Sequence, residues 1–138
     1  MLLAGLAALL AACTPEPGPP PTSLDSQLTG SIWRVEDINR EGIMDYAFLT
    51  MDFNTDGRIY GNAGCNTYGG SYKLSSNGGI IFGGLEVTEK HCEAEALMLQ
   101  EQRFIDALAS ADRYEYNEFG ALVLMGPEGK SVLALPVD

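Results

Sequence analysis

The stretch that decides the fold is Gly61-Asn62-Ala63-Gly64-Cys65-Asn66-Thr67-Tyr68-Gly69-Gly70-Ser71-Tyr72. It places four glycines, two asparagines, two tyrosines and one cysteine within twelve positions. Glycine accepts positive φ values and lets another backbone approach closely, so the stretch predicts a bulge or a tight turn. It interrupts two alternating runs, at residues 58–61 and 68–74, that are typical of β-strands.

Short alternating runs of apolar and polar residues continue on both sides of this stretch. Turn residues divide them, and they lie at residues 33–36, 49–53, 80–82, 85–88, 114–116, 122–124 and 133–135. Strands so close together leave no room for parallel crossovers, so the sheet is predicted to be antiparallel. The predicted fold class is mainly β, a small barrel-like meander of about eight strands with one amphipathic helix.

The helix is predicted at residues 93–110. Its apolar residues recur at steps of three and four, which places them on one face: Ala94, Leu97, Met98, Phe104, Ile105 and Leu108. Glu101 falls on the same stripe and allows two interpretations. Its carboxylate either reaches water or a backbone donor at the edge of the stripe, or it is a buried acid with a perturbed pKa and a functional role.

Composition limits the classes of partner. A chain of 138 residues is typical of one domain, and 8 basic against 19 acidic residues give a net charge of −11. Such a charge repels the phosphates of nucleic acid, so no nucleic-acid partner is expected. The same charge repels an anionic lipid surface unless a covalent anchor holds the protein there.

The start of the chain predicts such an anchor. Residues 1–12 are apolar and uncharged but too few to span ~30 Å of hydrocarbon, so they are predicted to be a signal peptide. No lysine or arginine precedes Cys13, although signal peptides usually begin with one, so the peptide is predicted to be truncated at its N-terminus. The run Leu10-Ala11-Ala12-Cys13 resembles the lipobox of bacterial lipoproteins. That resemblance implies that Cys13 is lipidated and becomes the mature N-terminus.

A tether is predicted at residues 13–29, ahead of a folded domain at residues 30–138. The tether is rich in proline and favours an extended polyproline II spacer of ~3.1 Å per residue. Thr14, rather than aspartate, follows the lipobox cysteine, which fits export to the outer membrane. The expected location is therefore the cell envelope, lipid-anchored to the outer membrane and facing the periplasm.

Cys65 and Cys92 remain once Cys13 carries lipid. An even number of cysteines in an oxidising compartment predicts a disulfide between them. Two other hypotheses use the same residues. Cys65, His91 and Cys92 are candidate zinc ligands, although a fourth ligand is missing. Cys65 is also a candidate nucleophile, with His91 as base and Glu101 orienting it.

The motifs together resemble one protein family. Trp33, then Gly61-x-x-Gly-Cys-Asn-x-Tyr-x-Gly-x-Tyr72, then Thr88-x-x-x-Cys92 are similar to the META domain of HslJ-type proteins, and the likeness runs from about residue 30 to the end. The resemblance implies a small, mostly antiparallel, barrel-like sheet with one helix. It also implies an envelope lipoprotein linked to heat shock and to novobiocin tolerance. It brings no catalytic chemistry.

The positions that carry the resemblance are interpreted as structural first. Gly61, Gly64 and Gly70 shape the turn or bulge, and Asn66 bonds nearby backbone. Tyr68 and Tyr72 pack with their hydroxyls at the rim of the sheet.

The function predicted is that of a non-enzymatic envelope lipoprotein that contributes to stress tolerance through protein contacts. Its expected partners are the membrane, through lipid on Cys13, and an envelope protein. It is expected to be a monomer and to need neither cofactor nor metal. The alternative is a binding module that holds a small hydrophobic ligand inside the barrel.

Overall fold

The computed structural model describes residues 13–14 and 24–137 of the chain. The predicted signal peptide, at residues 1–12, and most of the predicted tether lie outside the described residues. The elements follow in the order α1 (Leu24–Leu28), β1 (Ile32–Ile38), β2 (Thr50–Phe53), β3 (Arg58–Asn62), β4 (Thr67–Leu74), β5 (Ile80–Val87), α2 (Glu95–Ser110), β6 (Arg113–Tyr116), β7 (Leu122–Met125), η1 (Pro127–Gly129) and β8 (Ser131–Val137). No helix among these is long and apolar enough to cross a membrane.

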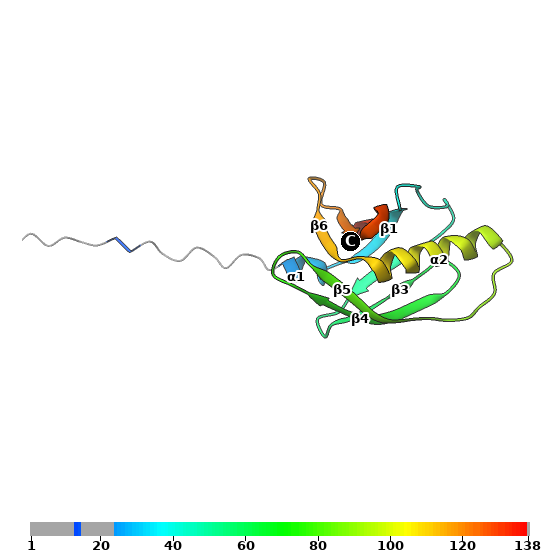
Figure 1. The fold of residues 1–138 in the computed structure, drawn as a ribbon, viewed down its shortest axis with the longest axis horizontal. Helices are drawn as coiled ribbons and strands as arrows, with labels where there is room; N and C mark the ends of the chain where they lie inside the picture. Colours follow the sequence, from blue (N-terminus) through cyan, green and yellow to red (C-terminus); the bar gives the residue numbers. More distant parts are fainter. Residues whose placement is uncertain (1–12, 15–23, 138) are drawn as a thin grey trace, which may run out of the picture.

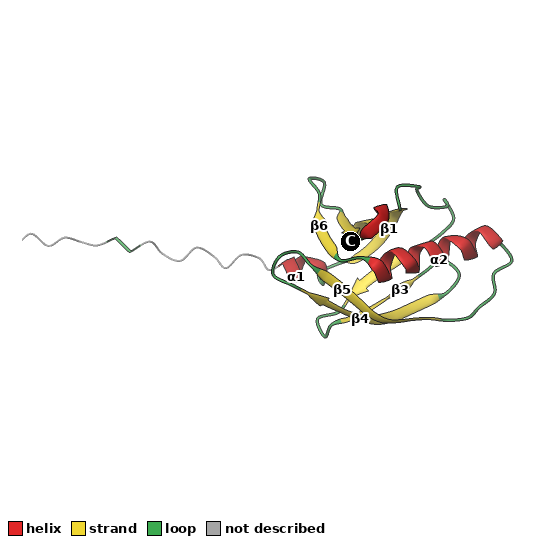
Figure 2. Cartoon of the chain, viewed as in Figure 1, coloured by secondary structure: helices red, strands yellow, loops and turns green. Residues whose placement is uncertain are grey.

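The eight strands form one antiparallel sheet in the order β5-β4-β3-β2-β1-β8-β7-β6. The sheet curls so that its two edge strands approach each other, and they meet at a bridge between Gly79 and Arg113. The helix α2 covers the side that remains open and contacts β5, β8 and β1 (Figures 1 and 2). This arrangement confirms the predicted fold class.

Side chains fill the interior of the curl. Alternate residues of the strands point inward, as the burial pattern of β2 shows, and α2 adds Phe104 and Leu108. The largest fully buried side chains include Trp33, Phe53 and Phe104, and Phe53 packs edge-on against Tyr72 with ring centroids 5.1 Å apart. Close packing of this kind is the usual state of a protein core. This filled interior gives no support to the alternative hypothesis that the barrel holds a small hydrophobic ligand.

Two local features differ from the sequence-based expectation. The structure has one strand, β5, where the glycine pair predicted two short ones, because Gly84, with φ of 56°, sits in a bulge and the pairing with β4 shifts register there. The packed domain also begins earlier than residue 30. Leu28, in α1, is fully buried, and its carbonyl accepts a hydrogen bond of 2.9 Å from the indole of Trp33.

Candidate functional site

Two glycines of the stretch at residues 61–72 lie where a side chain would collide with the backbone of another strand. A Cβ on Gly61 would lie 1.9 Å from the carbonyl oxygen of Thr50 in the neighbouring strand, and one on Gly70 would lie 2.9 Å from that of Gly83. Gly64 has a φ of 113°, in the region that favours glycine. The structure therefore gives these three glycines steric and conformational roles.

The two tyrosines of the motif are buried and point their hydroxyls at the β2 side of the sheet. Tyr68 donates a hydrogen bond of 2.8 Å to the carbonyl of Thr50, and Tyr72 donates one of 2.7 Å to that of Asn54. Burial raises the pKa of the Tyr68 hydroxyl far above its usual range, with a smaller contribution from the negative charge of Asp52. The Tyr68 hydroxyl thus ties β4 to β2, a strand that is not its direct neighbour, and the Tyr72 hydroxyl ties β4 to the residue that follows β2.

We expect Tyr68→Phe to lower the free energy of unfolding by about 1 kcal/mol, because the Thr50 carbonyl loses its donor. A raised pKa in the folded state stabilises the protein below the unfolded-state value of about 10, and this stability is lost as the pH rises above it. Urea unfolding at about pH 9 and about pH 11 should show a smaller loss for Tyr68→Phe than for the wild type. The exposed Tyr46→Phe is the control, and an equal loss in both variants would contradict the assignment.

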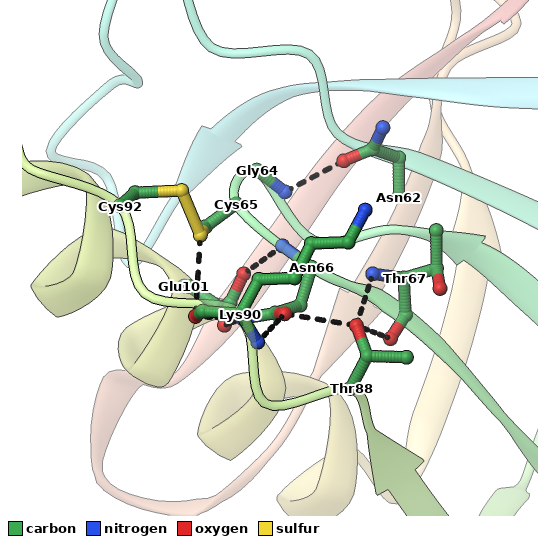
Figure 3. Close-up of a disulfide and its surroundings, with 9 residues drawn as sticks. All are labelled: Asn62, Gly64, Cys65, Asn66, Thr67, Thr88, Lys90, Cys92 and Glu101. Atoms are coloured by element: carbon green, nitrogen blue, oxygen red, sulfur yellow. Dashed lines mark hydrogen bonds between the residues drawn. A yellow bond between two sulfur atoms is a disulfide. The ribbon is translucent and has the colours of Figure 1, made fainter.

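The centre of the site is a buried pair formed by Asn66 and Glu101 (Figure 3). One oxygen of Glu101 accepts a hydrogen bond of 2.7 Å from the backbone N–H of Asn66, and the other accepts one of 2.7 Å from its side-chain amide. Glu101 is therefore buried, as the functional interpretation expected, yet both oxygens are engaged by a neighbour. The carboxylate holds α2 against the start of β4.

The carbonyl oxygen of the Asn66 side chain binds the segment that follows β5 (Figure 3). It accepts hydrogen bonds of 2.8 Å from the Thr88 hydroxyl and 2.7 Å from the backbone N–H of Lys90. The Asn66 amide also donates a longer bond of 3.3 Å to the Lys90 carbonyl. One side chain thus pairs with both backbone groups of Lys90, as a strand residue would.

The disulfide between Cys65 and Cys92 closes this cluster. Its Cα atoms are 6.0 Å apart, and the Cys65 sulfur lies 3.5 Å from the Lys90 carbonyl (Figure 3). The bridge leaves Cys65 without the free thiol that a nucleophile requires. It likewise leaves neither sulfur as a thiolate ligand for zinc, and no cluster of metal-binding side chains is found within the described part of the chain.

A groove of about 1280 Å³ runs between α2 and the segment that follows β5. Apolar side chains from both walls line it, among them Val87, Met98 and Ile105. Gln100 also lines it and is buried. Its carbonyl oxygen accepts a bond of 2.8 Å from the Met44 N–H, while its amide nitrogen has no partner among the described residues.

The sequence predicted some of these residues and missed others. Cys65, Asn66, Cys92 and Glu101 were singled out, and the structure brings all four together. Cys13 is exposed and far along the chain from this cluster, and His91 is exposed. The roles of Lys90 and Gln100 were missed, because Lys90 acts through its backbone and Gln100 lies on a helix face that only packing identifies.

The fold and the site define a class of small β-rich domains in which a disulfide and a buried asparagine–carboxylate pair dock one helix on a curled sheet. The family model of the META domain matches residues 26–138. The chain therefore belongs to the META domain family. A comparison with curated proteins finds no match.

Three solved structures have a similar fold. The NMR structure of a protein from Burkholderia xenovorans is 21% identical with a TM-score of 0.64, over 97% of this chain and 99% of that one. A second NMR structure is 23% identical with a TM-score of 0.64, over 80% and 93%. A crystal structure of a DUF4847 family protein from Bacteroides vulgatus is 16% identical with a TM-score of 0.57, over 80% and 94%. At these identities the likeness concerns the fold alone.

Proposed function

We propose that this META-domain protein is a non-enzymatic lipoprotein of the cell envelope that contributes to stress tolerance by binding another protein. The observation that carries the proposal is how the polar motif is used. Both oxygens of Glu101 bind Asn66, and the sulfur atoms of Cys65 and Cys92 bind each other. These groups hold α2 and the segment that follows β5 in place. The groove between α2 and that segment is therefore the feature available to a partner.

The proposed anchor is lipid on Cys13, with the protein facing the periplasm from the outer membrane as a monomer. The lipobox-like run before Cys13 supports this assignment, as does a disulfide, which persists in an oxidising compartment. The first turn of α2 lies at the opposite end of the domain from α1 (Figure 1). Because the proposed anchor precedes α1 in the chain, the proposal places the membrane on the side of α1.

The test is a strain that lacks the gene, grown at high temperature and with novobiocin or another envelope-directed antibiotic. We expect poorer survival than the wild type, restored by the wild-type gene and not by a Cys13→Ser variant that cannot be lipidated. The variant's cellular level is measured by immunoblot, so that loss of the anchor is distinguished from loss of the protein. Survival equal to that of the wild type would overturn the stress-tolerance proposal.

The anchor has its own measurement. Intact mass of the protein extracted from its membrane is expected to show three acyl chains on Cys13, since one chain holds a protein only marginally. Without reductant, the mass should also be lower by the two hydrogens lost in the disulfide. An unmodified Cys13 would contradict the lipid anchor while leaving the groove proposal standing.

A further inference from the structure

The segment after β5 continues to behave as an edge strand. Thr88 donates its N–H to the carbonyl of Thr67, 3.0 Å away, and two residues later Lys90 bonds the Asn66 side chain through both its backbone groups. Alternate residues of a strand direct their backbone groups to opposite sides. Thr88 and Lys90 therefore face β4 and Asn66, and the residues between and beside them face the other way.

The outward-facing residues are Val87, Glu89 and His91. No hydrogen bond within the described residues involves the N–H or C=O of Glu89 or His91. Val87 precedes Thr88, whose backbone bonds β4, so the N–H and C=O of Val87 point away from β4, as those of Glu89 do. β5 is also the terminal strand of the sheet. An edge of this kind presents unpaired donors and acceptors that can pair with another chain.

Asn66, Glu101 and the disulfide keep this edge in place. Asn66 and the disulfide hold the segment from the inner side, and Glu101 fixes Asn66. A segment fixed before binding loses less conformational entropy when a partner arrives. The cluster that the sequence singled out therefore preorganises a backbone edge.

The opposite wall of the groove comes from α2. Met98, Ile105 and Ala109 line it, together with Arg103 and Asp106, which form ion pairs with Glu41 and Lys130. A strand beside a helix forms the type of groove in which an added strand pairs its backbone with the edge and inserts alternate side chains against the helix. The amide nitrogen of Gln100, which also lines the groove, has no partner among the described residues.

We propose that residues 87–91 accept an extended segment of a partner protein as an added β-strand, with alternate apolar side chains of that segment against α2. Among the charged residues that line the groove, Arg103 pairs with Glu41 and Asp106 with Lys130, so the lining itself is close to balanced. The partner segment carries lysine or arginine rather than acidic residues, because the chain as a whole has a net charge of −11. This inference rests on the proposed function and names the partner's chemistry. Its test uses purified protein, so its failure is distinguishable from the failure of the survival test.

The experiment measures binding of a fluorescent octapeptide to the purified full chain by anisotropy. The peptide alternates valine with threonine and has a lysine at each end. Its control has the same side chains with the central backbone nitrogens methylated, which removes the donors of both its edges. We expect the control to bind at least about tenfold more weakly, because each lost backbone bond lowers affinity.

Two variants locate the pairing. Glu89→Pro removes the outward N–H, whereas Glu89→Ala keeps it and removes the same carboxylate. We expect the proline variant to bind the octapeptide at least about tenfold more weakly than the alanine variant, because both lack the carboxylate and only the proline variant lacks the N–H. The unfolding midpoints of the two variants should agree, because the Glu89 N–H is unpaired in the fold. By NMR, the amides of Glu89 and His91 should exchange with solvent more slowly once the peptide is added.

Four results would overturn the proposal. Two concern the backbone pairing: the methylated peptide binds as tightly as the unmethylated one, or the two Glu89 variants bind the octapeptide equally. Two concern the occupant: the protein binds laurate but neither peptide, or it self-associates and protects the Glu89 and His91 amides without any peptide.

Discussion

Replacing Cys65 and Cys92 together by serine is expected to lower the free energy of unfolding by about 3–4 kcal/mol. The disulfide closes a loop with a sequence separation of 27, and in the chain-entropy model removing it frees the unfolded chain. That loss is a large share of the ~5–15 kcal/mol typical of a domain. Equilibrium unfolding in urea, with the denaturant slope compared between variants, measures it.

Cys13→Ser is the matched control for this variant, since Cys13 is exposed and forms no disulfide. Its unfolding curve should overlay that of the wild type. Wild-type protein under reductant should approach the curve of the double variant. A double variant within about 0.5 kcal/mol of the wild type would show that the bridge contributes little to stability.

Glu101→Ala is expected to cost about 3–5 kcal/mol, because two hydrogen bonds to a buried carboxylate are lost at once. The N–H of Asn66 then remains buried without an acceptor, and its side-chain amide keeps only the longer bond to the Lys90 carbonyl. The Asn66 carbonyl oxygen is already bonded by Thr88 and Lys90, so the amide cannot turn over to compensate. Urea unfolding gives the free energy, and exchange of the Lys90 amide reports whether the loop has loosened.

Two substitutions on the same helix calibrate this result. Glu101→Gln keeps one acceptor but places an amide donor against a donor of Asn66, so about half of the alanine effect is expected. Gln102→Ala removes an exposed neighbour and should stay within about 0.5 kcal/mol of the wild type. If Glu101→Ala cost no more than Gln102→Ala, the carboxylate would not be the support that holds α2 on β4.

Several features of the fold follow from local sequence pattern. The alternation at residues 68–74 predicted β4, because one side of a strand faces the core and the other faces water. The three- and four-residue spacing of apolar residues predicted α2 to within two residues at its start. The pairing of Cys65 with Cys92 followed from their number and from the expected compartment. These inferences need the spacing and number of residues, and they need no knowledge of which segments pack together.

The tertiary structure decided which distant residues contact one another, which sequence pattern does not show. The bond between Asn66 and Glu101 joins residues 35 positions apart, and no local spacing distinguishes it from an exposed carboxylate at the edge of a stripe. The same holds for the pairing of Lys90 with Asn66, which uses backbone groups that every residue has. Closure of the sheet at Gly79 and Arg113 depends on the curl accumulated over eight strands.

The sequence alone thus determined most of the strands, the long helix α2, the disulfide and the family resemblance, because periodicity, cysteine count and short motifs can be recognised without knowing how the chain packs. Only the tertiary structure decided that the motif's polar residues bind one another and that a groove beside α2 remains. The physical reason is that burial and hydrogen-bond partnership depend on which distant segments meet.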